Sequence, residues 1–357
     1  MKKTLLAMAV LAASGAAFAQ SSVTLFGVVD GTLAFGKGSV SNLTQLTNSG
    51  YNSSRLGFRG VEDLGGGLNA SFHLEAGVNN DNGTGAATST NNQAVGAFDA
   101  ATGANSPVRA GTQGLTFNRR STVSLGGGFG EIRLGRDYTP QFWNHTVYDA
   151  FGTNGVGTSQ LLNSSLGGPT TVRASNSIGY FLPGNLGGFN GQVQYAMGEN
   201  ASTGAKNGNG FGLRFGYGAG PIAANLAYSR TTYAAGNITT TNAGASYDFG
   251  VAKISGLYDQ DKNGATTGKG FMVGLNAPVG AGEIRGSYGT YKTDAAGTPK
   301  TNKFALGYVH NLSKRTAAYA TLARVSNSGG AKQALNGSST AANGSSTGYD
   351  FGIRHSF

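Results

Sequence analysis

Apolar and polar side chains alternate with a period of two along most of this chain, the pattern of β-strands with one apolar and one polar face. In the last nine residues, YDFGIRHSF, Tyr349, Phe351, Ile353 and Phe357 share one face, and polar side chains occupy the other. Sixteen such segments lie near residues 23–31, 54–61, 68–76, 117–125, 131–136, 176–181, 189–196, 211–217, 222–230, 239–247, 251–259, 271–277, 283–291, 303–309, 316–324 and 349–357. The pattern predicts an all-β chain of sixteen strands.

The connections between these segments alternate between short and long. Gly-rich turns such as 126–130 and 218–221 join neighbouring segments, and long polar loops such as 77–114 and 137–175 separate others. Outer-membrane barrels have short periplasmic turns and long extracellular loops, whereas a soluble sandwich has no reason to sort its loops in this way. We therefore expect a 16-stranded antiparallel transmembrane β-barrel, forming one domain over residues 20–357 with both termini on the periplasmic side.

The charged side chains indicate which face of the strands is wet. In residues 211–217 the aromatic and aliphatic side chains oppose Arg214, and further along Ile284 and Tyr288 oppose Arg285. A packed soluble core would not hold such bulky charges, so we expect the apolar face to meet lipid and the polar face a water-filled lumen. Tyrosines near the segment ends predict an aromatic girdle at the lipid headgroups.

The N-terminus indicates the compartment. Lys2 and Lys3 precede an apolar run, and Ala17-Phe18-Ala19 forms an A-x-A cleavage site. This is the pattern of a secretory signal peptide over residues 1–19, and the apolar run is too short to span a bilayer as a mature helix. Together with the barrel pattern, it predicts the outer membrane of a Gram-negative bacterium.

Composition and motifs argue against several classes of function. The chain has no cysteine, so it offers no disulfide, thiolate nucleophile or cysteine metal ligand. Its four histidines lie far apart in sequence, and no Gly-x-Ser-x-Gly, Walker or H-E-x-x-H motif occurs. The formal charge of +10 comes from dispersed residues rather than from a basic helix. We therefore expect no catalytic residue, metal, cofactor or nucleic-acid partner.

Strand alternation turns several arginines toward the lumen. Because Leu56, Phe58, Val123, Ile132 and Leu134 face lipid, their polar neighbours face inward. The arginines expected on this wall are Arg55, Arg59, Arg120 and Arg133, with Arg136 at the mouth of the long loop. The same alternation predicts that Arg119 points outward or sits at the rim. Rigidly held guanidiniums in a narrow aqueous channel attract anions and repel cations.

The alternative role for these arginines is structural. Carboxylates such as Glu62, Asp63, Glu75 and Glu131 occur on the same strands, and each can pair with a lumenal guanidinium.

The loop over residues 137–175 is rich in aromatic residues and contains Trp143, the single tryptophan of the chain. A loop of this composition would expose much apolar area in solvent, so we expect this third loop to fold into the lumen opposite the arginines. Asp137 and Asp149 would then supply an opposing field. Alternatively, Trp143 is buried in the packing of the loop itself.

Several of these segments resemble the general porins of Neisseria and beta-proteobacteria. The resemblance rests on QSSVTLFGVVD (20–30), SRLGFRGVEDLGGGL (54–68), FNRRSTVSLGGGFGEIRLGRDYTP (117–140), GASYDFGVAK (244–253), LSKRTAAYA (312–320) and GIRHSF (352–357). It implies a trimeric 16-stranded barrel whose third loop forms an eyelet, with passive and often anion-preferring diffusion. The arginines of SRLGFRG, FNRR and RLGR are the eyelet charges it implies. The loop departs from the family pattern, because no acidic partner beyond Asp149 can be matched.

These observations predict a channel for small hydrophilic solutes and ions that prefers anions, with Arg55, Arg59, Arg120, Arg133, Arg136, Asp137 and Asp149 at its constriction. The alternative is a structural or adhesive barrel without significant conductance. The partners expected are two further copies of the chain, outer-membrane lipid and lipopolysaccharide, and small anions. The aromatic C-terminal residue resembles the signature presented to the barrel-assembly machinery. The Ser/Thr/Asn-rich loop 77–114 either latches a neighbouring subunit or varies at the cell surface.

Overall fold

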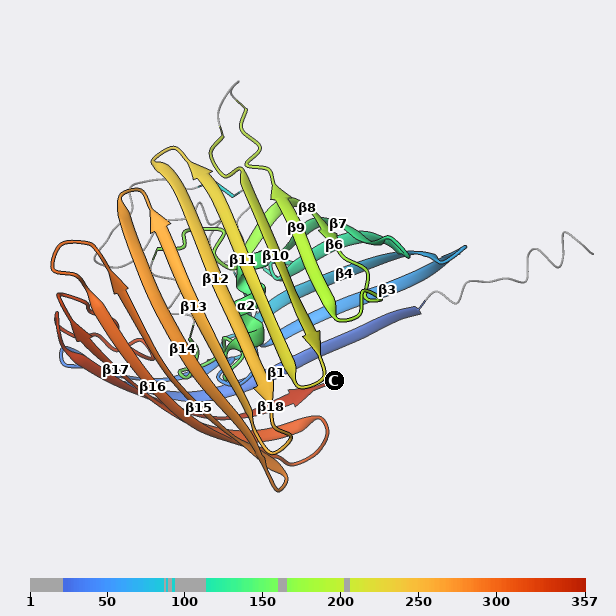
Figure 1. The fold of residues 1–357 in the computed structure, drawn as a ribbon. Helices are drawn as coiled ribbons and strands as arrows, with labels where there is room; N and C mark the ends of the chain where they lie inside the picture. The colour runs from blue at the N-terminus through green and yellow to red at the C-terminus, as the bar shows by residue number, and fades with distance from the viewer. Residues whose placement is uncertain (1–21, 87, 89–91, 94–113, 160–165, 202–205) are drawn as a thin grey trace, which may run out of the picture.

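Sixteen long antiparallel strands close into a barrel in the computed structural model (Figure 1), which confirms the predicted fold class. The structure describes residues 22–86, 88, 92–93, 114–159, 166–201 and 206–357. The barrel strands are β1 (Ser22–Lys37), β3 (Arg55–Gly65), β4 (Leu68–Asn79), β6 (Arg120–Gly127), β7 (Gly130–Tyr138), β8 (Arg173–Phe181), β9 (Phe189–Ala196), β10 (Gly210–Ala219), β11 (Ile222–Tyr233), β12 (Gly236–Asp248), β13 (Lys253–Asn263), β14 (Thr266–Val279), β15 (Gly282–Thr293), β16 (Lys300–Asn311), β17 (Thr316–Ser328) and β18 (Ser345–Ser356). The expected signal peptide and most of the loop 77–114 lie outside the described residues.

Two short strands extend the loops at the mouth of the barrel. β2 (Leu43–Asn48) pairs with β1, and β5 (Thr84–Gly85) pairs with the end of β4. Neither is long enough to cross a bilayer, which takes about 9–11 residues of strand. Each predicted segment therefore corresponds to one barrel strand.

The barrel closes where the first strand meets the last. β1 pairs with β18 from Val28↔Ser356 to Lys37↔Thr347, and its N-terminal half pairs with β3. Gly27 and Phe357 exchange both backbone hydrogen bonds, each at 3.1 Å. A side chain on Gly27 would overlap the Phe357 ring, so glycine lets the tip of the terminal aromatic ring lie against β1. Closure pairs the strand edges that an open sheet would expose.

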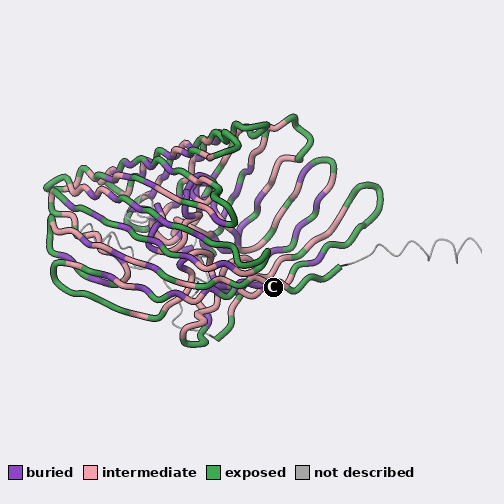
Figure 2. The backbone as a smooth tube through the Cα atoms, turned by 90° about the horizontal axis from the view of Figure 1, so that it is seen from below, coloured by how far each residue is buried: buried purple, intermediate pink, exposed green. Residues whose placement is uncertain are grey.

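Polarity is inverted relative to a soluble barrel. Large apolar side chains are exposed on the outer face of every barrel strand from β6 to β18, whereas Asp30, Asp259 and Asp261 have no exposed surface and Lys303 is 6% exposed. Figure 2 shows buried and exposed residues alternating along the strands. This arrangement follows from the period-two pattern, because lipid solvates the apolar face and the lumen holds the polar one.

Connections at the two ends of the barrel differ. Turns at the end that carries Phe357 are short, for example Gly66–Gly67 between β3 and β4 and Gly280–Ala281 between β14 and β15. At the other end, long loops follow β1, β4, β7, β9 and β17, but the connections after β11 and β13 are only two residues each. The predicted alternation of short and long connections therefore holds in the N-terminal half of the chain and is weaker in the C-terminal half.

The third loop lies inside the barrel and carries the helix α2 (Pro140–Tyr148), as Figure 1 shows. Asn144 Nδ2 donates to the Asn225 carbonyl oxygen (3.3 Å) and to Asn242 Oδ1 (2.9 Å), which fixes α2 against β11 and β12. The Tyr148 ring packs against Gly244, where any side chain would overlap it. Among the described residues, no helix has the length and apolar character needed to span a bilayer.

Beyond α2 the loop crosses to the seam of the barrel. The amide of Val156 donates to Asp350 Oδ2 on β18 (2.7 Å), and Lys303 Nζ on β16 donates to the Thr158 carbonyl oxygen (2.6 Å). Phe151 packs with Ala305, Ala323 and Val325 in a small core between the loop and the wall. The loop is therefore held on the inner surface from β10 round to β18.

Candidate channel constriction

One group of lumenal charges surrounds Glu75 on β4. Arg119 Nε is paired with Glu75 Oε1, Arg55 Nη1 lies 4.0 Å from the same oxygen, and His73 Nε2 lies 3.3 Å from Oε2. Arg55 is register-paired with Gly77 and Glu75 with Gly57, so alternation puts both on the inner face. One carboxylate thus faces two guanidiniums.

A second group surrounds Asp137 and Glu131 on β7. Arg133 Nη1 lies 2.5 Å from Asp137 Oδ2, and its Nε and Nη2 donate to the two carboxylate oxygens of Glu131, both at 2.9 Å. Arg120 Nε lies 3.9 Å from Asp137 Oδ2. The Arg133 guanidinium also lies 4.0 Å from the centre of the Phe181 ring. Arg133 is therefore fully engaged, whereas Arg120 is held more loosely.

Arg59 lies on the same inner face but closer to the periplasmic end. It is register-paired with His73, and its guanidinium lies 5.3 Å from the centre of the Phe26 ring. No carboxylate of the described residues lies within ion-pair distance of it. Arg59 therefore adds an uncompensated charge below the two groups.

The expectation that Arg119 points outward or sits at the rim is wrong. Besides Glu75, its guanidinium donates to the Tyr138 hydroxyl (3.2 Å), and only 11% of the side chain is exposed. The physical reason is that Arg119 precedes β6, which begins at Arg120, so the alternation of that strand does not apply to it. Arg173, which no motif had singled out, stacks on the other side of this cluster with its guanidinium 4.5 Å from the Tyr138 ring centre.

Arg136 is not brought together with these arginines. It is register-paired with Ser121, which is itself paired with the lipid-facing Leu74. Its Nε donates to the Asn118 carbonyl oxygen (2.6 Å) and its Nη1 to Ser175 Oγ (2.8 Å). Alternation explains this placement, because Arg136 lies between Gly135 and Asp137, which both belong to the inner face.

Asp149 does not present its carboxylate to the arginine wall. Its Oδ1 accepts from the Phe151 amide (2.9 Å), and its Oδ2 accepts from the amides of Thr153 (3.1 Å) and Ser159 (2.8 Å). These bonds hold the turn that follows α2. Asp149 thus shapes the loop, and the carboxylates near the arginines come from the wall itself.

The face of α2 that packs on the barrel wall is held by polar side chains of β10 and β13, across the lumen from the arginines. Arg214 Nε donates to Asn144 Oδ1 (2.6 Å), and His145 Nε2 lies 3.0 Å from Asp259 Oδ1. Complete burial lowers the pKa of His145 to about 4, so the ring is neutral at pH 7. Trp143 lies edge-on to Tyr138, with ring centres 5.3 Å apart, within the packing of the loop region.

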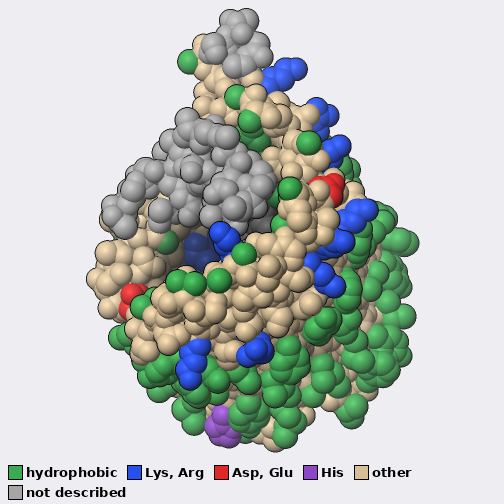
Figure 3. Space-filling model, turned by 90° about the vertical axis from the view of Figure 1, so that its left-hand side faces the viewer, with side chains coloured by type: hydrophobic (Ala, Val, Ile, Leu, Met, Phe, Trp, Pro, Cys, Tyr) green, Lys and Arg blue, Asp and Glu red, His purple; other side chains and the backbone are tan. Residues whose placement is uncertain are grey.

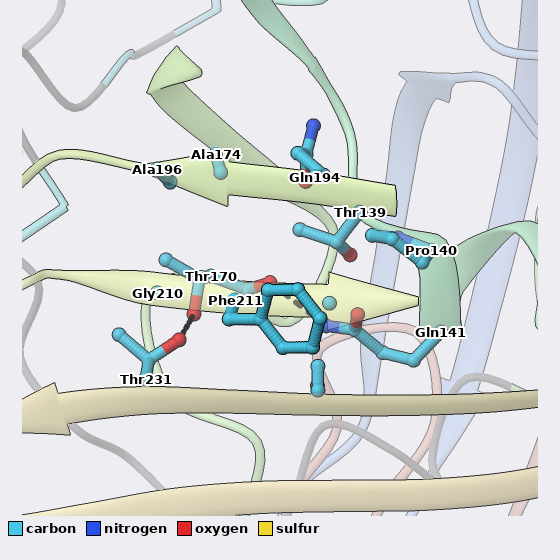
Figure 4. A pocket seen from close by; sticks show the side chains of 12 residues that line it. Thr139, Pro140, Gln141, Thr170, Ala174, Gln194, Ala196, Gly210, Phe211 and Thr231 are labelled. Carbon is cyan, nitrogen blue, oxygen red and sulfur yellow. Dashed lines mark hydrogen bonds between the residues drawn. The ribbon is translucent and has the colours of Figure 1, made fainter. Parts of the chain in front are cut away.

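The start of α2 fits closely against the barrel. Figure 4 shows the small cavity, about 20 Å³, between Thr139–Gln141 and strands β9–β11. Thr170 Oγ1 and Thr231 Oγ1 are hydrogen-bonded beside it (2.8 Å). A space of this size holds about one water molecule, so it is too small for solute to pass between α2 and these strands.

The lumenal charges on this wall do not cancel. Six arginines, Arg55, Arg59, Arg119, Arg120, Arg133 and Arg173, face three carboxylates, Glu75, Glu131 and Asp137, which leaves an excess of three positive charges. Alternation identified four of these arginines. Arg119 precedes β6, and Arg173 is the first residue of β8, before the segment 176–181 in which the sequence shows alternation.

Comparison with known proteins places this geometry in context. The sequence matches a family described as Gram-negative porin over residues 5–330. It is 40% identical to outer membrane porin protein 32 of Delftia acidovorans over the whole of both chains. It is 30% identical to an outer membrane porin of Bordetella pertussis, covering 90% of this chain and 93% of that protein. A solved structure described as an anion-selective porin from Comamonas acidovorans superposes with a TM-score of 0.81 at 38% identity, covering 95% of this chain and all of that one.

Proposed function

This chain belongs to the Gram-negative porin family, and from that premise we propose that it forms an anion-preferring channel for passive diffusion of small hydrophilic solutes. Membership of this family confirms the prediction that the chain is an outer-membrane porin and not an enzyme. The selectivity and the constriction are the further step proposed here.

The observation that carries this proposal is the excess of positive charge on the inner wall from β3 to β8. Guanidiniums stay protonated at any physiological pH, so the excess persists under all growth conditions. Field lines in a channel with low-dielectric walls are focused into the water, which raises the local concentration of anions. The effect reaches about 8 Å at physiological ionic strength, so it depends on a narrow passage.

The third loop supplies that narrow passage in our proposal. It fills the side of the lumen along β10 to β18, so solute is left with the space between the loop and the arginine wall. The 38% identical structure described as anion-selective supports the same direction of preference. A structural or adhesive barrel would need neither an inward loop nor uncompensated lumenal arginines.

Measuring the reversal potential of the protein in a planar bilayer under a salt gradient tests this proposal. We expect open-channel conductance and a potential of the sign that anion permeation gives. Cation preference would refute the arginine assignment, and absence of conductance by well-folded protein would favour the structural barrel.

We also propose that the channel is a homotrimer, that lipopolysaccharide contacts its outer face, and that the C-terminal strand is read by the barrel-assembly machinery. The supporting observation for the last is that Phe357 lies at the seam on β1. Chemical crosslinking of the purified protein tests the trimer.

A further inference from the structure

A recess of about 390 Å³ lies between the turn that follows α2 and the periplasmic ends of β12–β15. Its wall carries one register row across these four strands, in which Asp248 pairs with Lys253, Lys253 with Asn276, and Asn276 with Arg285. Alternation places the row on the inner face, because Lys253 has the same parity as the buried Ser255. The outer face of the barrel, by contrast, is hydrophobic on the side that Figure 3 shows. The row therefore meets solute and not lipid.

Lys253 and Asp248 face this recess with unused charges. They stand directly opposite each other on β13 and β12, where the side chains begin about 5 Å apart. Nevertheless, among the described residues no ion pair within 4.0 Å joins the two or links either of them to another side chain. Asp248 Oδ1 accepts from the Gly250 amide (2.8 Å), which leaves Oδ2 open. One cation and one anion are thus available side by side.

The second pair of charges in the recess is already satisfied. Arg285 Nε donates to Glu283 Oε1 (2.5 Å), and the same oxygen accepts from Asn276 Nδ2 (3.0 Å). Asn276 Nδ2 also donates to the Ala150 carbonyl oxygen (3.0 Å), which ties this wall to the turn after α2. The Arg285 guanidinium lies 4.5 Å from the centre of the Tyr51 ring. These contacts fix the shape of the recess and leave Lys253 and Asp248 as its open charges.

The charge pattern selects against simple ions. An anion at Lys253 would be repelled by Asp248, and a cation at Asp248 would be repelled by Lys253. A solute that carries both charges a few ångströms apart satisfies both residues at once through charge-assisted hydrogen bonds. An α-amino acid has this form, because its ammonium and carboxylate are attached to the same carbon. Val147 of α2, which is exposed, and Pro278 of β14 line the recess and offer an apolar surface to its side chain.

We propose that this recess binds a zwitterionic α-amino acid on the periplasmic side of α2. The carboxylate of the amino acid is held by Lys253, its ammonium by Asp248, and an apolar side chain lies against Val147 and Pro278. The inference rests on the water-filled lumen of a porin and goes beyond anion preference, because a zwitterion has no net charge for the arginine wall to attract. The recess thus retains solutes that the arginines do not concentrate.

Saturation-transfer difference NMR of the full-length protein in detergent micelles tests this proposal, with L-leucine as the probe. The unmodified protein should give a saturable signal. Lys253→Gln and Asp248→Asn should each raise the dissociation constant about tenfold, because each removes a hydrogen bond between charged groups. The matched controls are Lys314→Gln and Asp63→Asn, in exposed turns at the same end of the barrel; Asp63 Oδ1 accepts from a turn amide (2.9 Å) as Asp248 Oδ1 does. Both controls should bind leucine as the unmodified protein does.

Two analogues of leucine test the same point on the unmodified protein, without any substitution. 4-Methylpentanoate lacks the ammonium of leucine and 3-methylbutylamine lacks its carboxylate, so each should bind about tenfold more weakly than leucine. Equal binding of 4-methylpentanoate and leucine would identify a plain anion site and overturn the proposal. Leucine binding that is unchanged in the Lys253 and Asp248 variants, or absent from the unmodified protein, would overturn it as well. NMR requires no ionic current, so this result is separate from that of the reversal potential.

Discussion

Individual arginines on the inner wall differ in how much of their charge reaches the channel. Arg119 and Arg133 are 11% exposed and make close ion pairs, whereas Arg55 and Arg120 are 23% and 24% exposed and lie 3.9–4.0 Å from their carboxylates. A tightly paired guanidinium contributes little net field outside its pair. Of these four, the more exposed two should therefore add most to the selectivity, beside the unpaired Arg59, and the buried two should contribute most to the integrity of the wall.

Replacing Arg55 and Arg120 together by Gln should shift the reversal potential toward cation permeation. The physical reason is that the excess of three positive charges on the wall falls to one while Glu75 and Asp137 keep their tight partners. Planar-bilayer recordings under a salt gradient measure the shift. Arg230→Gln, which removes an exposed outward charge from β11, is the control and should leave the potential unchanged. An unchanged potential in the double variant would remove Arg55 and Arg120 from the constriction.

Sequence alternation predicts which face a side chain lies on when the residue is within a strand, but not when the residue lies just outside one. It turned Arg55, Arg59, Arg120 and Arg133 inward as the structure does. It failed for Arg119, which precedes β6. Arg136 was assigned to the constriction because it lies near the long loop, although its position in the alternation of β7 directs its side chain outward. Asp149 was assigned to the constriction by its charge alone, but its carboxylate accepts hydrogen bonds from backbone amides of the turn after α2.

At the scale of elements, the third loop is held by buried polar contacts as well as by its buried aromatic side chains, Tyr148 and Phe151. The sequence predicted an inward loop opposite the arginines, because the loop would otherwise expose apolar area, but it did not identify the residues of the wall that hold the loop. Their identity depends on contacts between residues far apart in sequence, such as Asn144 with Asn242 and Tyr148 with Gly244. Single-sequence patterns carry no information on such pairs.

Docking of α2 should weaken as the pH falls. His145 is buried with a pKa of about 4, whereas an exposed histidine titrates near 6.5. Between these values the undocked ring binds a proton that the docked ring does not, so stability is lost from about pH 6.5 downward and the loss is complete near pH 4.

The measurement is the thermal unfolding midpoint and the single-channel conductance between pH 7 and 4. The variant His145→Gln removes the titrating group, so its midpoint should depend less steeply on pH than that of the unmodified protein. Parallel pH profiles for the two proteins would show that His145 does not couple protonation to loop docking.

At the scale of the whole molecule, barrel closure depends on the contact between Gly27 and Phe357. Gly27→Val would force its side chain into the Phe357 ring and should destabilise the barrel by about 1–3 kcal/mol. Urea unfolding followed by circular dichroism measures the effect. Gly286→Val, on the outer face of β15 with open space around it, is the matched control and should cost less. Equal losses would show that the seam tolerates the larger side chain.

The bond between Val156 and Asp350 ties the third loop to β18, the last strand of the chain. Every other wall the loop touches is made of residues synthesised earlier, but this anchor exists only once the final strand is in place. An incompletely assembled barrel therefore lacks one support of its narrow passage. The passage reaches its final width at the same step as the seam, which links the permeability of the finished channel to the completion of its folding.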